Sequence, residues 1–176
     1  MSVKINYKNS ISNKISSNPI LFVDEKFNLA DSKKNLSNLE YLYISDLLKT
    51  SDLKKEILFF KINSKKIIYL ISLKKDLKIF ELENLGAKFF ALLKENKQNN
   101  YNISAETKYK GIENFINYFL HGLKLKSYEF NKYKSKKSKK NISINVIDNK
   151  DKASSQKKLR FKGIEEGTFF ARDLVS

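Results

Sequence analysis

The chain has 176 residues, 41% of them hydrophobic, which is enough for one domain with an ordinary core and excludes a disordered chain. The chain has no cysteine, which excludes disulfides and thiolate metal sites. It has no signal-peptide core, and no apolar run comes near the ~20 residues that a membrane span needs, so we expect a cytoplasmic protein. The net charge of +16 comes from 33 lysines and two arginines. Lysine, together with the 19 asparagines and 18 isoleucines, is encoded by A- and T-rich codons, so codon bias explains the charge. Only weak, salt-sensitive binding of nucleic acids follows from it.

Four strands and one helix are predicted in the first half of the chain. Alternating or continuous apolar residues mark the strands, at 3–7, 20–23, 57–62 and 67–73. The first of these is short and alternates apolar with polar residues, as an edge strand does. One helix ends near Thr50, and the face that we expect it to bury carries Leu39, Leu42, Tyr43 and Leu47.

Three helices and two strands are predicted in the second half. An amphipathic helix covers 81–95 and presents Leu82, Leu85, Phe89, Leu92 and Leu93. A longer helix begins after the weak caps Ser104 and Thr107 and presents Tyr109, Ile112, Ile116, Phe119, Leu120 and Leu123. Short strands are expected at 101–103 and 142–146, and a last helix at 159–175. Gly86 and Gly122 lie inside helices at a cost of about 1 kcal/mol each, which we expect a close helix–sheet approach to explain.

This alternation of strands and helices predicts an α/β layer fold, with helices covering a mixed or largely parallel sheet. No internal repeat and no interdomain linker interrupts it, so one domain is expected. The final helix reaches Ser176 without a C-cap glycine, a pattern that predicts continuation of the chain.

No motif for catalysis stands out. His121 is the single histidine and lies near a predicted helix end, where a structural role is the simplest interpretation. The chain has no Gly-rich phosphate loop, Gly-x-Ser-x-Gly elbow or His-Glu-x-x-His pair. Glu81 with Glu83, and Glu165 with Glu166, are more simply solvated helix surface than acid–base couples, because such couples need burial that separates their pKa values.

A lysine run around Tyr133 is the candidate contact for a polyanion. Its members are Lys132, Tyr133, Lys134, Lys136, Lys137, Lys139 and Lys140. A tyrosine between lysines can stack a base while the ammonium groups neutralise phosphates. The simpler interpretation is a solvated loop in a lysine-rich chain. A nucleic-acid- or polyanion-binding α/β module is therefore the alternative function, and a nucleotide-holding domain is a weaker third one because the Gly-rich loop is missing.

Five segments, in order along nearly the whole chain, carry a family resemblance. They are residues 43–54, 66–71, 85–88, 122–134 and 163–175. The fourth joins a glycine to a tyrosine-x-phenylalanine-x-x-tyrosine-lysine pattern and a basic loop, and the fifth ends on Ala171-Arg172-Asp173-Leu174-Val175. Taken together they resemble the N-terminal domain of the leucyl (cytosol) aminopeptidase family.

The resemblance implies a three-layer, macro-like α/β domain with helices on both faces of a mixed, mostly parallel sheet. It implies that residues 1–176 are a single non-catalytic N-terminal domain, truncated in the interdomain helix at about 157–176, with the catalytic domain absent. The parent would release N-terminal amino acids from peptides with two divalent metals, zinc or manganese, and form a homohexamer. Metal and catalytic residues would lie in that absent domain, the expected partner of this one, so we assign no catalytic, metal or cofactor-binding residue here.

Overall fold

Six strands form one mixed sheet in the computed structural model, which describes residues 2–8, 18–105, 109, 111–129, 140–147 and 155–175. The strands are β1 Ser2–Lys8, β2 Asn18–Asp24, β3 Ile57–Lys61, β4 Ile67–Leu73, β5 Asn100–Ser104 and β6 Asn141–Ile147. Their order is β1-β6-β5-β2-β4-β3, and every neighbouring pair is parallel except β3 with β4. The predicted α/β class is confirmed, and β1 is an edge strand as expected.

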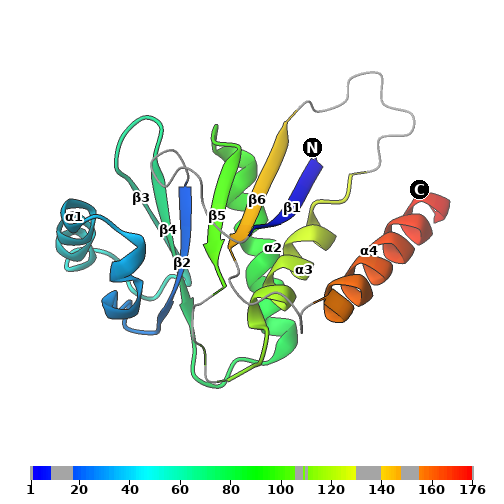
Figure 1. The fold of residues 1–176 in the computed structure, drawn as a ribbon, viewed down its shortest axis with the longest axis horizontal. Helices are drawn as coiled ribbons and strands as arrows, with labels where there is room; N and C mark the ends of the chain where they lie inside the picture. Colours follow the sequence, from blue (N-terminus) through cyan, green and yellow to red (C-terminus); the bar gives the residue numbers. More distant parts are fainter. Residues whose placement is uncertain are drawn as a thin grey trace.

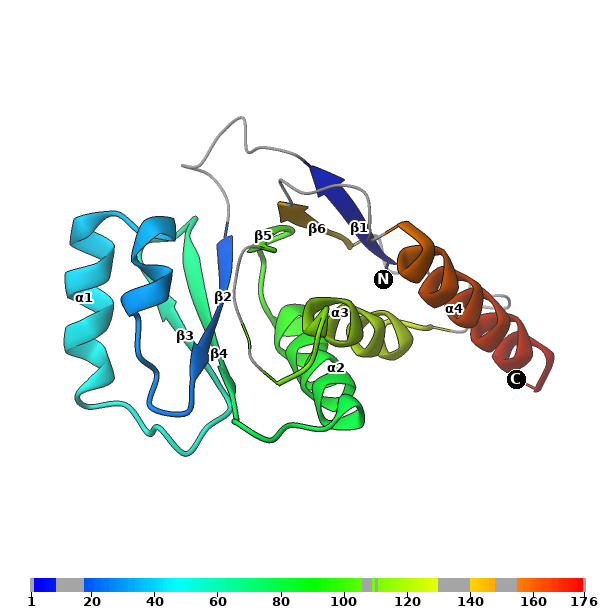
Figure 2. The same cartoon turned by 60° about the horizontal axis from the view of Figure 1, so that its bottom comes forward.

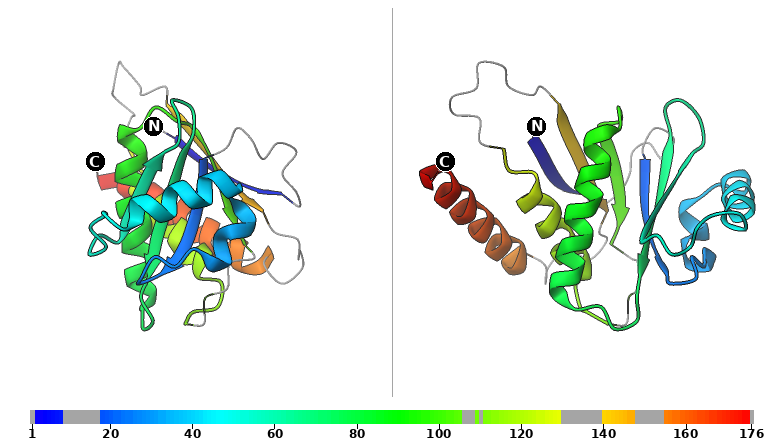
Figure 3. Two further views of the ribbon diagram at one scale, coloured as in Figure 1. Left: turned by 90° about the vertical axis from the view of Figure 1, so that its left-hand side faces the viewer. Right: turned by 180° about the vertical axis from the view of Figure 1, so that it is seen from behind.

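Helices cover both faces of this sheet (Figures 1 and 2). The short helix η1 (Ala30–Asn35) and α1 (Asn38–Leu48) lie over β2, β4 and β3 on one face. Helices α2 (Ile79–Glu95) and α3 (Phe115–Lys126) pack side by side on the other, as the view from behind in Figure 3 also shows. The last helix, α4 (Ser155–Val175), packs on α3 beyond the edge strand β1.

The larger part of the core lies between the sheet and α2 and α3. Its centre is aromatic: the Phe22 ring on β2 meets Phe119 edge-on at 5.2 Å, and Phe89 lies 5.6 Å from Phe119. Edge-to-face pairs of this kind add roughly 1 kcal/mol each beyond the area that they bury. The hydroxyl of Tyr69 is buried here without a hydrogen-bond partner in the described part of the chain. Burial raises the pKa of Tyr69 to about 12, which the neighbouring Tyr101 hydroxyl offsets only in part.

Gly86 and Gly122 are required by helix–helix contact, so the predicted helix–sheet reason is wrong. A Cβ atom on Gly86 would lie 1.9 Å from the Phe119 carbonyl oxygen on α3. A Cβ atom on Gly122 would lie 1.9 Å from the Glu83 carbonyl oxygen on α2. Each glycine therefore contacts the backbone of the other helix directly, and α2 and α3 lie closer together than a side chain at either position would allow.

The buried face predicted for α1 is largely wrong. Leu39 is 81% exposed and Leu42 64% exposed, whereas Ile44 is completely buried. The helix is oriented by Glu40, which closes a capping box with Ser37 and pairs with Lys66 at the start of β4, Nζ to Oε1 2.5 Å. Burial raises the pKa of Glu40, but the Lys66 and Ser37 hydrogen bonds outweigh it and leave that pKa below its usual value. With Glu40 directed toward Lys66, Leu39 and Leu42 face solvent.

Helix α3 begins later than predicted. Ser104 ends β5, which pairs in register with β6, so it cannot cap a helix. The helix starts instead at Phe115, after Asn114 in the left-handed backbone conformation at φ 58°. Tyr109 and Ile112 precede the helix and still pack against the core, which explains why their spacing matched the helical stripe.

Candidate functional site

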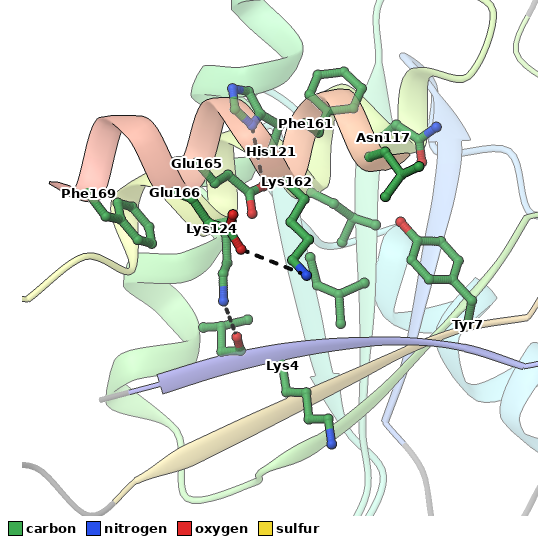
Figure 4. Close-up of a pocket in the computed structure, with 14 residues that line it drawn as sticks. Lys4, Tyr7, Asn117, His121, Lys124, Phe161, Lys162, Glu165, Glu166 and Phe169 are labelled. Carbon is green, nitrogen blue, oxygen red and sulfur yellow. Dashed lines mark hydrogen bonds and ion pairs between the residues drawn. The ribbon is translucent and has the colours of Figure 1, made fainter. Parts of the chain in front are cut away.

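A cleft of about 680 Å³ lies between β1, α3 and α4 (Figure 4). Its floor is formed by Val3, Ile5 and Tyr7 of the edge strand. Its inner wall comes from α3 and its roof from α4, whose Phe161 and Phe169 line it. The volume lies within the range of about 300–1,000 Å³ that is usual for ligand sites. The lining surface is mainly apolar, although half of the 14 lining residues are polar or charged.

His121 joins α3 to α4 on the inner side of the cleft. It is 6% exposed, and its Nδ1 lies 3.3 Å from Glu165 Oε1. The Phe161 ring lies 4.9 Å from the imidazole and 5.2 Å from the Tyr118 ring, edge-on to the latter. The structure thus places His121 in a helix–helix contact, in agreement with the structural role that the sequence favours.

The other end of α4 is attached by Arg172, Asp173 and Phe169. The Tyr128 hydroxyl donates to Asp173 Oδ1 at 2.8 Å, and its ring lies 5.3 Å from the Phe169 ring. The Arg172 guanidinium donates to the Leu125 carbonyl oxygen at 3.0 Å and lies 5.4 Å from the centre of the Tyr128 ring. Polar and aromatic contacts therefore hold α4, in contrast with the close backbone packing of α2 on α3.

Lys124 closes the end of the cleft near the start of β1. Its ammonium donates to the Val3 carbonyl oxygen, a bond that ties α3 to the edge strand. Burial lowers the pKa of Lys124, and the nearby Glu165 carboxylate raises it in part. Lys162 hangs from α4 into the cleft in Figure 4, with Nζ 3.8 Å from Glu166 Oε1.

The carboxylate pairs form no acid–base couple. Glu165 contacts His121, whereas Glu166 contacts Lys162 and its side chain is 69% exposed. Glu81 accepts from the Lys78 backbone N–H at 2.8 Å and completes the capping box of α2. The Glu83 backbone receives Gly122. Each of these glutamates has a structural contact or a solvated position.

Only Lys140 of the predicted polyanion contact lies within the described residues; Lys132, Tyr133, Lys134, Lys136, Lys137 and Lys139 lie outside them. The Lys140 ammonium donates to the carbonyl oxygens of Leu93 at 2.6 Å, Lys94 at 3.3 Å and Asn96. It therefore caps the carbonyl end of α2, where a positive charge is favourable. Burial lowers the pKa of this ammonium. Polyanion binding by the other six residues stays a prediction.

The described residues do not fit a metal centre. Within them, no three His, Cys, Asp or Glu side chains gather in a group that could hold an ion. In the same residues, no helix has both the length and the apolar character needed to cross a bilayer.

The outer face of α4 is apolar and exposed, a feature that the sequence did not assign. Its exposed side chains are Ile164, Phe170, Leu174 and Val175. Phe170 and Val175 are 66% and 86% exposed. Isolated exposed apolar residues are ordinary, whereas a row along one helix is typical of an interaction surface.

The fold is similar to part of a solved leucine aminopeptidase. Superposition on a mutant of the tomato enzyme gives a TM-score of 0.64 at 15% sequence identity, over 94% of this chain and 36% of that one. The chain thus spans little more than a third of the length of that enzyme. No family model matches the sequence, and no curated protein matches it either. At this identity the comparison shows a shared fold, from which function does not follow directly.

Proposed function

We propose that this chain is the N-terminal accessory domain of a metal-dependent leucyl aminopeptidase. The observation that carries the proposal is the structural match, which takes in almost all of this chain and about a third of the tomato enzyme. The five ordered segments support it independently, because they come from the sequence and not from the backbone. The chain would then be one piece of a larger enzyme and would hold no reaction centre.

The outer face of α4 supports the same proposal. Its row of leucine, isoleucine, phenylalanine and valine side chains is uncovered, and a following catalytic domain would bury it. Burial of apolar surface stabilises such a contact by roughly 25 cal/mol per Å². In this proposal the accessory domain covers the catalytic one and helps to shape a homohexamer. The two divalent metals, zinc or manganese, would be held by the catalytic domain.

The reading frame tests the proposal first. The gene is expected to continue past Ser176 into a second domain that carries the metal ligands and acts on peptides. A natural stop codon directly after Ser176 would count decisively against an accessory domain.

Activity separates the two parts. The 176-residue chain alone should release no p-nitroaniline from leucine p-nitroanilide with manganese, whereas the product of the continued frame should do so. In that longer protein, Phe170→Asp on the outer face of α4 should lower the melting temperature of the catalytic domain. Leu42→Asp, at an exposed apolar position of α1, is the matched control. Equal melting of both variants would contradict the docking role of α4.

A further inference from the structure

The floor of the cleft is also the open edge of the sheet. The Ser2 N–H donates to the Lys140 carbonyl oxygen at 3.1 Å, on the side of β6. Because backbone groups alternate between the two edges of a strand, those of Val3 and Ile5 point away from β6, and the Val3 carbonyl accordingly accepts from Lys124. No strand in the described ranges pairs with this outer edge.

Helix α4 runs beyond this edge (Figure 2), and the cleft lies between the helix and the edge strand (Figure 4). The side chains of Val3 and Ile5 line the floor, and Phe161 and Phe169 line the roof. An edge strand that faces a helix across an apolar groove is a geometry in which an extended peptide adds to the sheet. Its main chain would bond to the outward N–H of Val3 and the outward N–H and carbonyl of Ile5, because the Val3 carbonyl is held by Lys124, and alternate side chains would enter the groove.

The charges in the groove favour a peptide that ends there. Lys162 points into the cleft, and its contact with Glu166 joins side chains that are 70% and 69% exposed. An ion pair this exposed contributes less than about 1 kcal/mol, so a competing carboxylate can replace Glu166. The Lys124 ammonium lines the same cleft but is bonded to the Val3 carbonyl, and Glu165 there faces His121. Displacement of Glu166 would therefore leave the Lys162 ammonium, beside an apolar floor, for a C-terminal carboxylate that follows apolar side chains.

We propose that the cleft binds the C-terminal segment of an extended, apolar peptide as an added strand beside β1, with its carboxylate at Lys162. The proposal does not depend on the aminopeptidase function. A chain with no catalytic domain would still bind the peptide, and an accessory domain could lack the site.

The test uses the 176-residue chain and a fluorescein-labelled probe, Gly-Val-Thr-Val-Thr-Leu, followed by fluorescence anisotropy. The expected result is saturable binding that weakens about fivefold when the C-terminal carboxylate is replaced by an amide, roughly the contribution of one charged contact. Lys162→Gln should remove this preference. Failure of the probe to bind at millimolar concentration, to a chain shown by circular dichroism to be folded, overturns the proposal.

A matched pair of variants at Ile5 tests the strand geometry. Ile5→Pro removes an N–H that points away from β6 and is tolerated in an edge strand, while the β1–β6 ladder stays intact. Ile5→Ala keeps the N–H and loses only side-chain contact. Ile5→Pro should bind the probe about fivefold more weakly than Ile5→Ala. Equal binding overturns the proposal, as does binding of laurate, an apolar carboxylate without a peptide backbone, in the absence of peptide binding.

Discussion

Helix α3 has two helical neighbours, and it contacts them in opposite ways. Against α2 it packs backbone to backbone through Gly86 and Gly122, inside a continuous aromatic core. Against α4 it uses rings and polar groups, among them His121 with Glu165 and Tyr128 with Asp173. The first contact is part of the core. The second leaves the far face of α4 apolar and exposed in the described part of the chain.

The largest effect should come from the glycines of the α2–α3 contact. Gly122→Ala would place a methyl group 1.9 Å from the Glu83 carbonyl oxygen, so the helices must separate, at a cost of about 3 kcal/mol in the free energy of unfolding. The control is Gly167→Ala on α4, where an added Cβ atom would meet no neighbouring atom within 4 Å. The greater helix propensity of alanine should there raise the free energy of unfolding by up to about 1 kcal/mol. Urea denaturation measures both. Wild-type stability of Gly122→Ala would show that the close approach is not required.

The core on the α2 side should also set the alkaline limit of stability. Burial raises the pKa of Tyr69 to about 12, against about 10 in an unfolded chain. Because the unfolded state loses this proton first, the contribution of Tyr69 to stability should be complete below pH 10 and fall as the pH rises toward 12, by about 2–3 kcal/mol. Burial raises the pKa of the neighbouring Tyr101 as well, which adds to the slope in the same direction. Urea titrations between pH 8 and 11.5 should show this slope and its reduction in Tyr69→Phe.

At neutral pH, Tyr69→Phe should differ from the wild type by less than about 1 kcal/mol. The hydroxyl that it removes has no hydrogen-bond partner in the described part of the chain, so little is lost with it. An unchanged alkaline slope would mean that another group limits stability there.

The attachment of α4 should break separately from the core. Glu165→Gln removes the charge that faces His121 and should weaken the α3–α4 contact by about 1 kcal/mol. Trypsin should then cut within α4 several times faster, while amide protection in α2 is unchanged. Glu166→Gln is the control, because its exposed pair with Lys162 contributes little. Loss of α2 protection in Glu165→Gln would show that the two contacts are one cooperative unit.

The smallest effect should come from the outer face of α4. Ile164→Ser should change the stability of this chain by less than about 0.5 kcal/mol, because the side chain is 44% exposed. Phe161→Ser, whose ring contacts Tyr118 and His121, should instead release α4. Differential scanning calorimetry distinguishes the two. Similar losses would mean that both faces of α4 are already covered.

The strands were predictable because each carries its own signal. The alternation of residues 142–146 predicted which side of β6 is buried and which is half-buried. The continuous apolar run at 67–73 predicted the buried strand β4. The face of α1 was not predictable, because the Glu40–Lys66 ion pair that orients it joins residues far apart in the sequence. Leu39 and Leu42 made the more apolar stripe, and that stripe is the exposed one.

One side of the cleft could be predicted from the sequence, and the other could not. The alternation of residues 3–7 places Val3, Ile5 and Tyr7 on one side of an edge strand, which is the floor. The roof was not predictable, since docking of α4 depends on contacts such as Tyr128 with Asp173, 45 residues apart. Gly86 and Gly122 signalled close packing, but sequence alone cannot show that each glycine faces the other helix.

The cap at the end of α2 changes how the lysine-rich run must be studied. Lys140 holds three carbonyl groups of that helix end, so removing its charge loosens the fold before any nucleic acid is added. Glutamine substitutions in this run should therefore cover Lys132 to Lys139 and leave Lys140 unchanged. A shallower dependence of binding on salt then reports lost phosphate contacts and not a partly unwound helix.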